Sequence, residues 1–253
     1  MKTLVGMTEF SDPVFDRSWE RWVLEKRNPT ILITKNFGKL IQEYPLILAQ
    51  DNILIHATVT GYGGSFMEPN VRPPQEILDW LRSNIYKERV VIRIDPIIPI
   101  EPFISQSKQI YDYCKTLGYK RFRISILDLY KHVLDRFERE VNSSSFLYDL
   151  KKAYAYDPLL THEHTMHAPL VLRKKVIDMF PDAVVCGEPG IKCEGCISRK
   201  DLELMKVKLE KRYPLCEQRE FCSCLGIKKQ LVKSGTCEHG CLYCYMFKNA
   251  QAG

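Results

Sequence analysis

Short apolar runs rich in β-branched residues alternate with amphipathic segments along most of the chain. The runs that indicate strands cover residues 3–7, 30–34, 53–60, 89–95, 121–127 and 183–186. Several are almost continuously apolar, as parallel strands are when both faces are buried. The repeated order of strand, helix and strand predicts a parallel sheet with right-handed crossovers.

The segments between these runs carry helix signals. Asp12–Pro13 and Pro73–Pro74 are helix starts, and Gly118 is a helix stop. Further helices are predicted at residues 105–117, 128–141, 168–180 and 198–211. The stretch 142–165, which begins with three serines, is predicted to be a long loop.

Six such strands fit either an open doubly wound sheet or an incomplete barrel. No glycine-rich phosphate loop follows the first strand, which disfavours the dinucleotide-binding form of the open sheet. The sequence therefore predicts an α/β fold, a partial (β/α)6 barrel of parallel strands over residues 1–188. A cysteine-rich, metal-binding segment over residues 189–253 is expected to pack on the barrel mouth.

Composition adds little except through cysteine. The 253 residues carry a formal charge of +6, a mild excess that permits an anionic substrate or nucleic acid without indicating one. No apolar run approaches the roughly 20 residues of a membrane helix, and no secretory signal is evident, so a cytoplasmic protein without membrane contact is expected. Ten cysteines in such a chain point to metal or redox chemistry.

Polar residues follow the apolar strands, where parallel α/β folds collect their functional groups. We expect these residues to line a site: Lys35, Thr60, Tyr62, Arg93, Asp95, Ser125 and Glu188. Arg93 and Asp95 project to the same side of a strand, so they could form a structural ion pair. Alternatively, Lys35, Arg93, Asp95 and Glu188 could act on a substrate or anchor the carboxylate, ammonium or ribose of a cofactor.

The strongest local signal is the run from Cys237 through Cys241 to Cys244. Three thiolates at this spacing can hold a four-iron–four-sulfur (4Fe-4S) cluster and leave one iron without a protein ligand. That iron can bind S-adenosylmethionine, whose reductive cleavage gives a 5′-deoxyadenosyl radical. Tyr243 could pack on the cofactor and exclude solvent. Zinc is the alternative, with His239 as its fourth ligand.

A second group of cysteines precedes this run. It contains Cys186, Cys193, Cys196, Cys222 and Cys224, with Cys216 nearby. The pairs Cys193–Cys196 and Cys222–Cys224 resemble metal-binding pairs, so four ligands are easily found. Spacing alone does not decide between a second iron–sulfur cluster and a structural zinc ion.

The sequence SGTCEHGCLYCY, preceded by QREFCSC, resembles the family called domain of unknown function 1848. Further similar segments are ITKN, TVTGYG, RIDPII, ISILDLY and CGEPG, so the resemblance covers most of the chain. It implies a protein similar to radical S-adenosylmethionine enzymes, with the cluster on Cys237, Cys241 and Cys244. It also implies Cys186, Cys196, Cys222 and Cys224 as a second metal set. The family is distantly similar to spore photoproduct lyase, which keeps nucleic acid open as a substrate.

The leading hypothesis is thus a radical S-adenosylmethionine enzyme of unassigned substrate, supplied with electrons by a reductant such as flavodoxin or ferredoxin. One alternative is a non-catalytic zinc-binding module that contacts nucleic acid. A second is a metal-dependent barrel hydrolase that uses His56, His132 and the histidines of residues 162–167.

Overall fold

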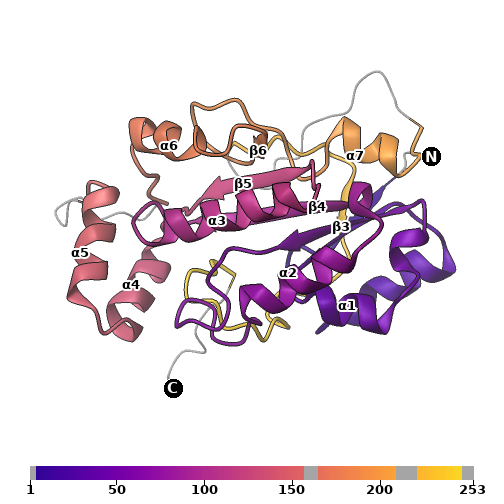
Figure 1. The fold of residues 1–253 in the computed structure, drawn as a ribbon, viewed down its shortest axis with the longest axis horizontal. Helices are drawn as coiled ribbons and strands as arrows, with labels where there is room; N and C mark the ends of the chain where they lie inside the picture. The colour runs from indigo at the N-terminus through magenta and orange to yellow at the C-terminus, as the bar shows by residue number, and fades with distance from the viewer. Residues whose placement is uncertain (1–3, 157–164, 209–220, 247–253) are drawn as a thin grey trace.

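The computed structural model of the protein describes residues 4–156, 165–208 and 221–246 (Figure 1). Seven strands in these ranges form one sheet with the order β6-β5-β4-β3-β2-β1-β7, and every neighbouring pair is parallel. The strands are β1 (Val5–Met7), β2 (Thr30–Thr34), β3 (Ile53–Thr58), β4 (Val90–Ile97), β5 (Phe122–Ile126), β6 (Ala183–Val185) and β7 (Lys228–Gln230). The α/β class and the parallel sheet are confirmed.

All six predicted strands occur within a few residues of their expected bounds. They lie in chain order across the sheet from β1 to β6, which is consistent with a partial barrel. The seventh strand, β7, pairs with β1 from the far end of the chain. Its three polar residues carry no apolar signal, so the sequence did not predict it. The division into residues 1–188 and 189–253 stays a prediction.

Five of the six predicted helices are present and two helices were not predicted, whereas the helix expected from Asp12–Pro13 was wrong, because that segment forms only a 3₁₀ turn and a π turn. The described helices are α1 (Phe37–Glu43), α2 (Pro74–Ser83), α3 (Phe103–Thr116), α4 (Lys131–Glu140), α5 (Ser144–Ala153), α6 (Leu170–Ile177) and α7 (Arg199–Leu204). Short 3₁₀ turns occur at Arg17–Trp19, Ile47–Ala49 and Lys87–Arg89, and one π turn at Arg21–Glu25.

The prediction of a loop over residues 142–165 was wrong for α5. The side chain of Ser143 accepts a hydrogen bond from the Phe146 N–H, so the serine run begins a helix instead of a loop. Helix α5 then buries Phe146 and Leu150. Helix α1 was also not expected.

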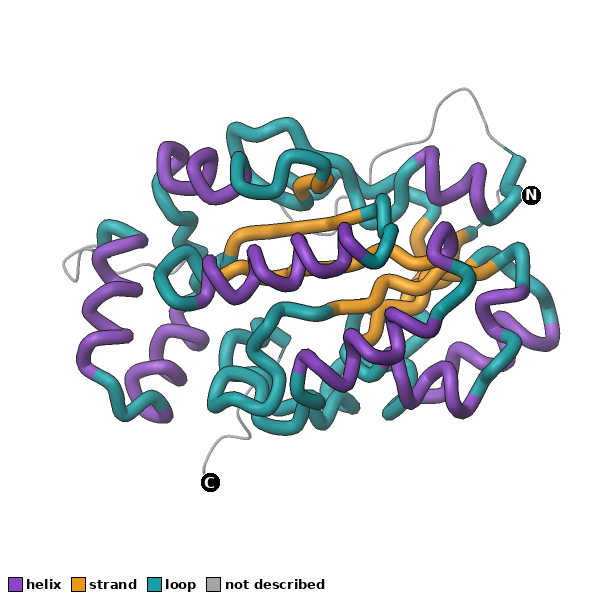
Figure 2. Tube along the Cα trace, in the orientation of Figure 1, coloured by secondary structure: helices purple, strands orange, loops and turns teal. Residues whose placement is uncertain are grey.

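The sheet separates two hydrophobic cores. Successive side chains of a strand point to opposite faces, and Leu32 of β2 joins the larger core, whereas its neighbour Ile31 joins the smaller one. The larger core includes the buried faces of α2 and α3, which lie across the front of the sheet in Figure 2. The smaller core contains Cys186, Cys196 and Cys224. Loops and α7 therefore cover the second face where helices cover the first.

None of the helices within the described ranges has the length and apolar character needed to cross a membrane.

Candidate functional site

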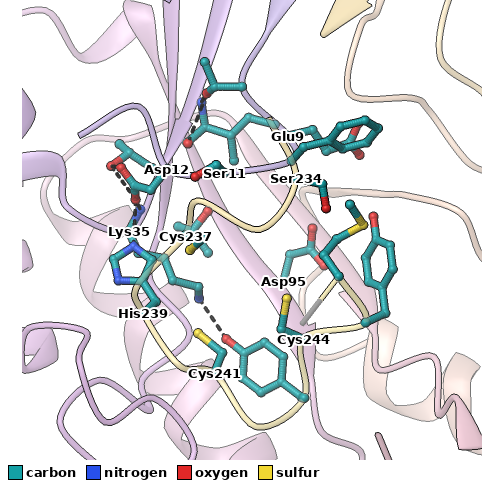
Figure 3. A pocket seen from close by; sticks show the side chains of 18 of the residues that line it. Glu9, Ser11, Asp12, Lys35, Asp95, Ser234, Cys237, His239, Cys241 and Cys244 are labelled. Atoms are coloured by element: carbon teal, nitrogen blue, oxygen red, sulfur yellow. Dashed lines mark hydrogen bonds and ion pairs between the residues drawn. The ribbon is translucent and has the colours of Figure 1, made fainter. Parts of the chain in front are cut away.

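A cavity of about 710 Å³ lies at the carboxyl ends of β1 to β4 (Figure 3). Its walls include Glu9 and Lys35, which follow β1 and β2, and Asp95, which lies within β4. The loop that carries Cys237, Cys241 and Cys244 closes it from the other side, and the three thiols lie around one open space. Its volume is within the range of small-molecule sites.

The cysteine loop is fixed at several points. Asn70 binds it through two hydrogen bonds, from Asn70 N to His239 O (3.3 Å) and from Asn70 Nδ2 to Glu238 O (2.9 Å). Arg136 of α4 donates from Nη1 to Leu242 O (2.7 Å) and Cys244 O (3.0 Å). These contacts give hydrogen-bond donors to four carbonyls of the loop. The loop is thus held in place by the protein on two sides.

Burial governs the thiols of this triad. It raises the pKa of Cys241, and the nearby Lys35 ammonium opposes that shift only in part. Burial also raises the pKa of Cys237, although the backbone N–H groups of His239 and Asp12 point at its sulfur and lower it. Burial therefore favours the protonated thiols of Cys237 and Cys241, whose protons a bound metal would displace.

Lys35 connects the cavity wall to a buried carboxylate. Its Nζ lies 2.7 Å from Glu68 Oε1 and donates to Tyr243 Oη at 2.8 Å. The same Glu68 oxygen accepts from Thr60 Oγ1 at 2.8 Å and from the Tyr243 hydroxyl. Burial disfavours the Lys35 charge, but Glu68 and Cys241 outweigh it and raise the pKa of Lys35. Lys35 is therefore a fixed cation beside Cys241.

Arg93 and Asp95 form the ion pair that strand alternation suggested. Both line the cavity. The Ser125 hydroxyl donates a hydrogen bond to Asp95 Oδ1, whereas Arg93 pairs with Asp95 Oδ2. Arg93 also donates from Nη1 to Cys196 Sγ at 3.1 Å. One guanidinium thus reaches the cavity and the second cysteine group at once.

In the second group, Cys186, Cys196, Cys222 and Cys224 contact one another. Cys186 Sγ lies 3.7 Å from Cys196 Sγ, and the Cys196 N–H donates to Cys224 Sγ at 3.0 Å. Side-chain hydrogen bonds also join Cys196 to Cys224 and Cys224 to Cys222. We call these four residues the cysteine quartet.

The pKa shifts within the quartet run in both directions: the hydrogen bond to Cys196 raises the pKa of Cys224, whereas the pKa values of Cys196 and Cys222 are lowered. Hydrogen bonds from Cys186 and Cys224 hold the pKa of Cys196 well below its usual value, and Arg93 and Arg123 lower it further. A hydrogen bond from Cys224 lowers the pKa of Cys222 to about 6. Cys193 points elsewhere: its sulfur bonds to the backbone of Glu188 (3.1 Å from N, 3.4 Å from O) and Ile191 O (3.3 Å).

Four predicted site residues lie outside the cavity lining. Tyr62 is buried, and its hydroxyl contacts Ser107 Oγ (3.0 Å) and accepts from Ile98 N (3.2 Å). Thr60 supports Glu68, and Ser125 supports Asp95, as described above. Glu188 accepts from Ile126 N at 2.6 Å and pairs with Arg173 at 3.3 Å; burial raises its pKa to about 7. Direct roles for these four residues, Glu188 included, stay predictions.

The histidines considered for a hydrolase have separate environments. His56 is fully buried in β3, and burial holds its pKa well below the usual value. His132 contacts Tyr245 O (3.1 Å), and His167 pairs with Asp128 (2.9 Å). The two other histidines of the 162–167 string, and Cys216, lie outside the described residues. His239, which lines the cavity, binds Asp12 Oδ2 through Nε2 at 2.8 Å.

Sequence reasoning missed Asp12, Glu68 and Arg136. Asp12 was interpreted only as a helix cap, yet it also accepts from Thr34 Oγ1 (2.9 Å) and Lys35 N (2.7 Å). Glu68 lies in an irregular loop with no periodic signal. Glu9 could have been found, because it follows β1 just as Lys35 follows β2.

The donor sets suit metal, although the described residues contain no group of three His, Cys, Asp or Glu side chains already arranged as a metal site. Cysteine sulfur is the ligand that iron–sulfur clusters and structural zinc use. The triad sulfurs border a cavity, and the quartet thiols form a chain of contacts from Cys186 through Cys196 and Cys224 to Cys222. The residues therefore fit the groups that the sequence suggested, without showing that either is bound.

Comparison with known proteins identifies a family without a function. No curated protein and no solved structure matches the chain. The family described as domain of unknown function, DUF1848, matches residues 2–246, nearly the whole sequence. The chain belongs to the DUF1848 family.

Proposed function

We propose that the protein is a radical S-adenosylmethionine enzyme. One observation carries the proposal: three cysteines of a single anchored loop surround an open space in a cavity large enough for a small molecule. Cys237, Cys241 and Cys244 would hold a 4Fe-4S cluster with one iron facing that space. Bound there, the cluster supplies the electron that cleaves the carbon–sulfur bond of S-adenosylmethionine into methionine and a deoxyadenosyl radical.

The residues of the cavity would bind and orient S-adenosylmethionine. Lys35 keeps its charge beside Cys241, where it offsets the negative charge of a thiolate-bound cluster and can attract a carboxylate. Asp95 is held by Arg93 and Ser125, so its carboxylate is fixed for an ammonium or ribose hydroxyl. Tyr243 lines the cavity and packs against Lys35, whose Nζ lies 5.5 Å from the centre of the ring.

The experiment is anaerobic reconstitution of the full chain with iron and sulfide, followed by reductant and S-adenosylmethionine. The expected result is about four irons and four sulfides above the metal content of a Cys241→Ala variant, with 5′-deoxyadenosine formed only by the unaltered protein. Cys114→Ala is the matched control, because Cys114 is buried in α3 away from the cavity lining. Deoxyadenosine from the Cys241→Ala protein would refute the proposal.

A zinc site is the second candidate, and His239 carries it. Its Nε2 is held by Asp12, while its buried Nδ1 has no hydrogen-bond partner among the described residues. A carboxylate-held histidine is a common zinc ligand. A His239→Gln variant separates the two: it keeps the iron cluster under our proposal, whereas a three-cysteine, one-histidine zinc site would lose its ion.

A further inference from the structure

The cysteine quartet is built from Cys186 at the end of β6 and from two loops that pack directly on each other. Leu225 N donates to Ile197 O at 3.2 Å, which joins the loop of residues 193–197 to that of residues 222–225. Gly195 makes this approach possible, because a Cβ there would lie 2.2 Å from Cys224 N and 2.3 Å from its Cα. The close contact sets the Cys196 and Cys224 side chains together at the centre of the smaller core.

The spacing of the sulfurs distinguishes a single ion from a cluster. Zinc–sulfur bonds of about 2.3 Å make the edge of a regular tetrahedron about 3.8 Å. Cys186 Sγ and Cys196 Sγ lie 3.7 Å apart, and the Cys196 side chain also forms a hydrogen bond with the Cys224 thiol. In a four-iron cluster each cysteine binds a different iron. The sulfur atoms of its ligands are therefore much farther apart than two sulfur atoms in contact.

The surroundings supply what a tetrathiolate ion needs. The Cys196 N–H donates to Cys224 Sγ, and Arg93 donates to Cys196 Sγ. Such second hydrogen bonds fix ligand orientation and stabilise charge on sulfur. Arg123 and Lys228 add positive potential at Cys196, although each also pairs with a carboxylate.

We propose that Cys186, Cys196, Cys222 and Cys224 bind one tetrahedral divalent ion, zinc or ferrous iron, and not a four-iron cluster. The ion joins the end of β6 to the loop that leads into β7. It therefore fixes the floor of the cavity from below, through Cys196 and the hydrogen bond to Arg93. Cys193, which bonds to the backbone of Glu188 and Ile191, is not one of the four ligands in this assignment.

The test isolates the quartet in the full chain. A variant with Cys237, Cys241 and Cys244 replaced by Ala is purified anaerobically and analysed for metals and acid-labile sulfide. The expected result is one zinc or iron per chain without sulfide; a colourless protein indicates zinc, and a thiolate-to-iron charge-transfer spectrum after oxidation indicates iron. Four irons with sulfide would overturn the proposal. Because this variant lacks the triad, the result does not depend on the proposed radical chemistry.

A cobalt titration tests the ligand set. After metal removal, Co²⁺ should give the absorption of tetrahedral tetrathiolate cobalt at one equivalent. Adding Cys196→Ser should weaken binding at least tenfold, whereas adding Cys193→Ser should not change it. Equal losses from both substitutions, or a disulfide between Cys186 and Cys196 with no cobalt bound, would overturn the assignment.

If the triple variant does not fold, X-ray absorption on the unaltered protein decides the same question. At the zinc edge we expect four sulfur ligands at about 2.3 Å around an isolated ion, and for iron we expect the Mössbauer spectrum of a single tetrahedral ferrous site. Nitrogen or oxygen ligands, or no metal besides the triad cluster, would contradict it.

Discussion

The triad and the quartet use the same side chain in opposite ways. Cys237, Cys241 and Cys244 come from one loop and border an open cavity. The quartet comes from the end of β6 and two loops, and it is part of a hydrophobic core in which Cys186 Sγ and Cys196 Sγ are in contact. Three ligands around free space suit an ion or cluster with a vacant position for a substrate, whereas four converging ligands suit a closed structural site.

The electrostatic environments of Cys196 and Cys241 also differ. In the quartet, hydrogen bonds from neighbouring thiols and two arginines lower the pKa of Cys196. In the triad, burial raises the pKa of Cys241 against the single Lys35 charge. Cysteine content alone therefore does not define a metal site; the number of converging sulfurs and the charges around them do.

The largest effect on stability should come from removing the charge of Lys35, which lines the triad cavity. Lys35→Met leaves the Glu68 carboxylate, 1% exposed, without its ion pair. Breaking a buried pair from one side costs about 3–5 kcal/mol in the free energy of unfolding. Urea denaturation measures this loss. The quartet should keep its metal in the folded variant.

Two comparisons sharpen that result. Lys39→Met removes a half-exposed lysine 4.0 Å from Glu43 and should cost less than about 1 kcal/mol. Adding Glu68→Gln to Lys35→Met should restore part of the stability. Equal losses from Lys35→Met and Lys39→Met would show that the cavity pair is not structural.

A smaller effect should come from Gly195→Ala in the quartet. The added Cβ meets the Cys224 backbone, which cannot move without separating the two loops. Overpacking of this kind costs about 1–3 kcal/mol, and the variant should lose metal from the quartet while the triad cluster still forms. Thermal unfolding and metal analysis measure the two effects.

Gly235→Ala is the matched change in the loop before the triad. Gly235 has φ +86° and no atoms within 4 Å of an added Cβ, so only backbone strain of about 1 kcal/mol is expected. Full retention of quartet metal in the Gly195→Ala protein would contradict the packing argument.

The smallest effect should come from Arg93→Lys, which tests the link between the two regions. Lysine keeps the charge but cannot hold Asp95 and Cys196 with the same fork. Cobalt affinity of the quartet should fall about tenfold. Arg89→Lys, whose guanidinium donates to Gln50 O and Leu204 O, is the control and should leave affinity unchanged. Equal affinities would show that Arg93 does not support the quartet.

Several features of the fold that depend on the local sequence were predicted correctly. Apolar runs placed six strands, and side-chain alternation anticipated the Arg93–Asp95 pair. The strand β7 was not predicted because three polar residues at a sheet edge carry no hydrophobic signal. Helix α5 was not predicted because serines occur both in loops and at helix starts.

The site was harder to predict because its members are distant in the chain. Spacing suggested Cys193 and Cys196 as a pair, but the fold sets Cys186 against Cys196, since Cys193 turns toward the Glu188 backbone. Glu68 is recognised as a site residue only from the structure, in which it forms hydrogen bonds with Lys35 and Tyr243. Such contacts depend on tertiary packing, which sequence spacing does not contain.

The central claim is that the triad leaves one iron open to S-adenosylmethionine. Electron paramagnetic resonance of the reduced, reconstituted protein tests it directly, with and without S-adenosylmethionine. We expect the signal of a reduced 4Fe-4S cluster, and a change in its g-values when S-adenosylmethionine binds. A cluster signal that S-adenosylmethionine leaves unchanged, or a protein that forms no such cluster, would contradict the account.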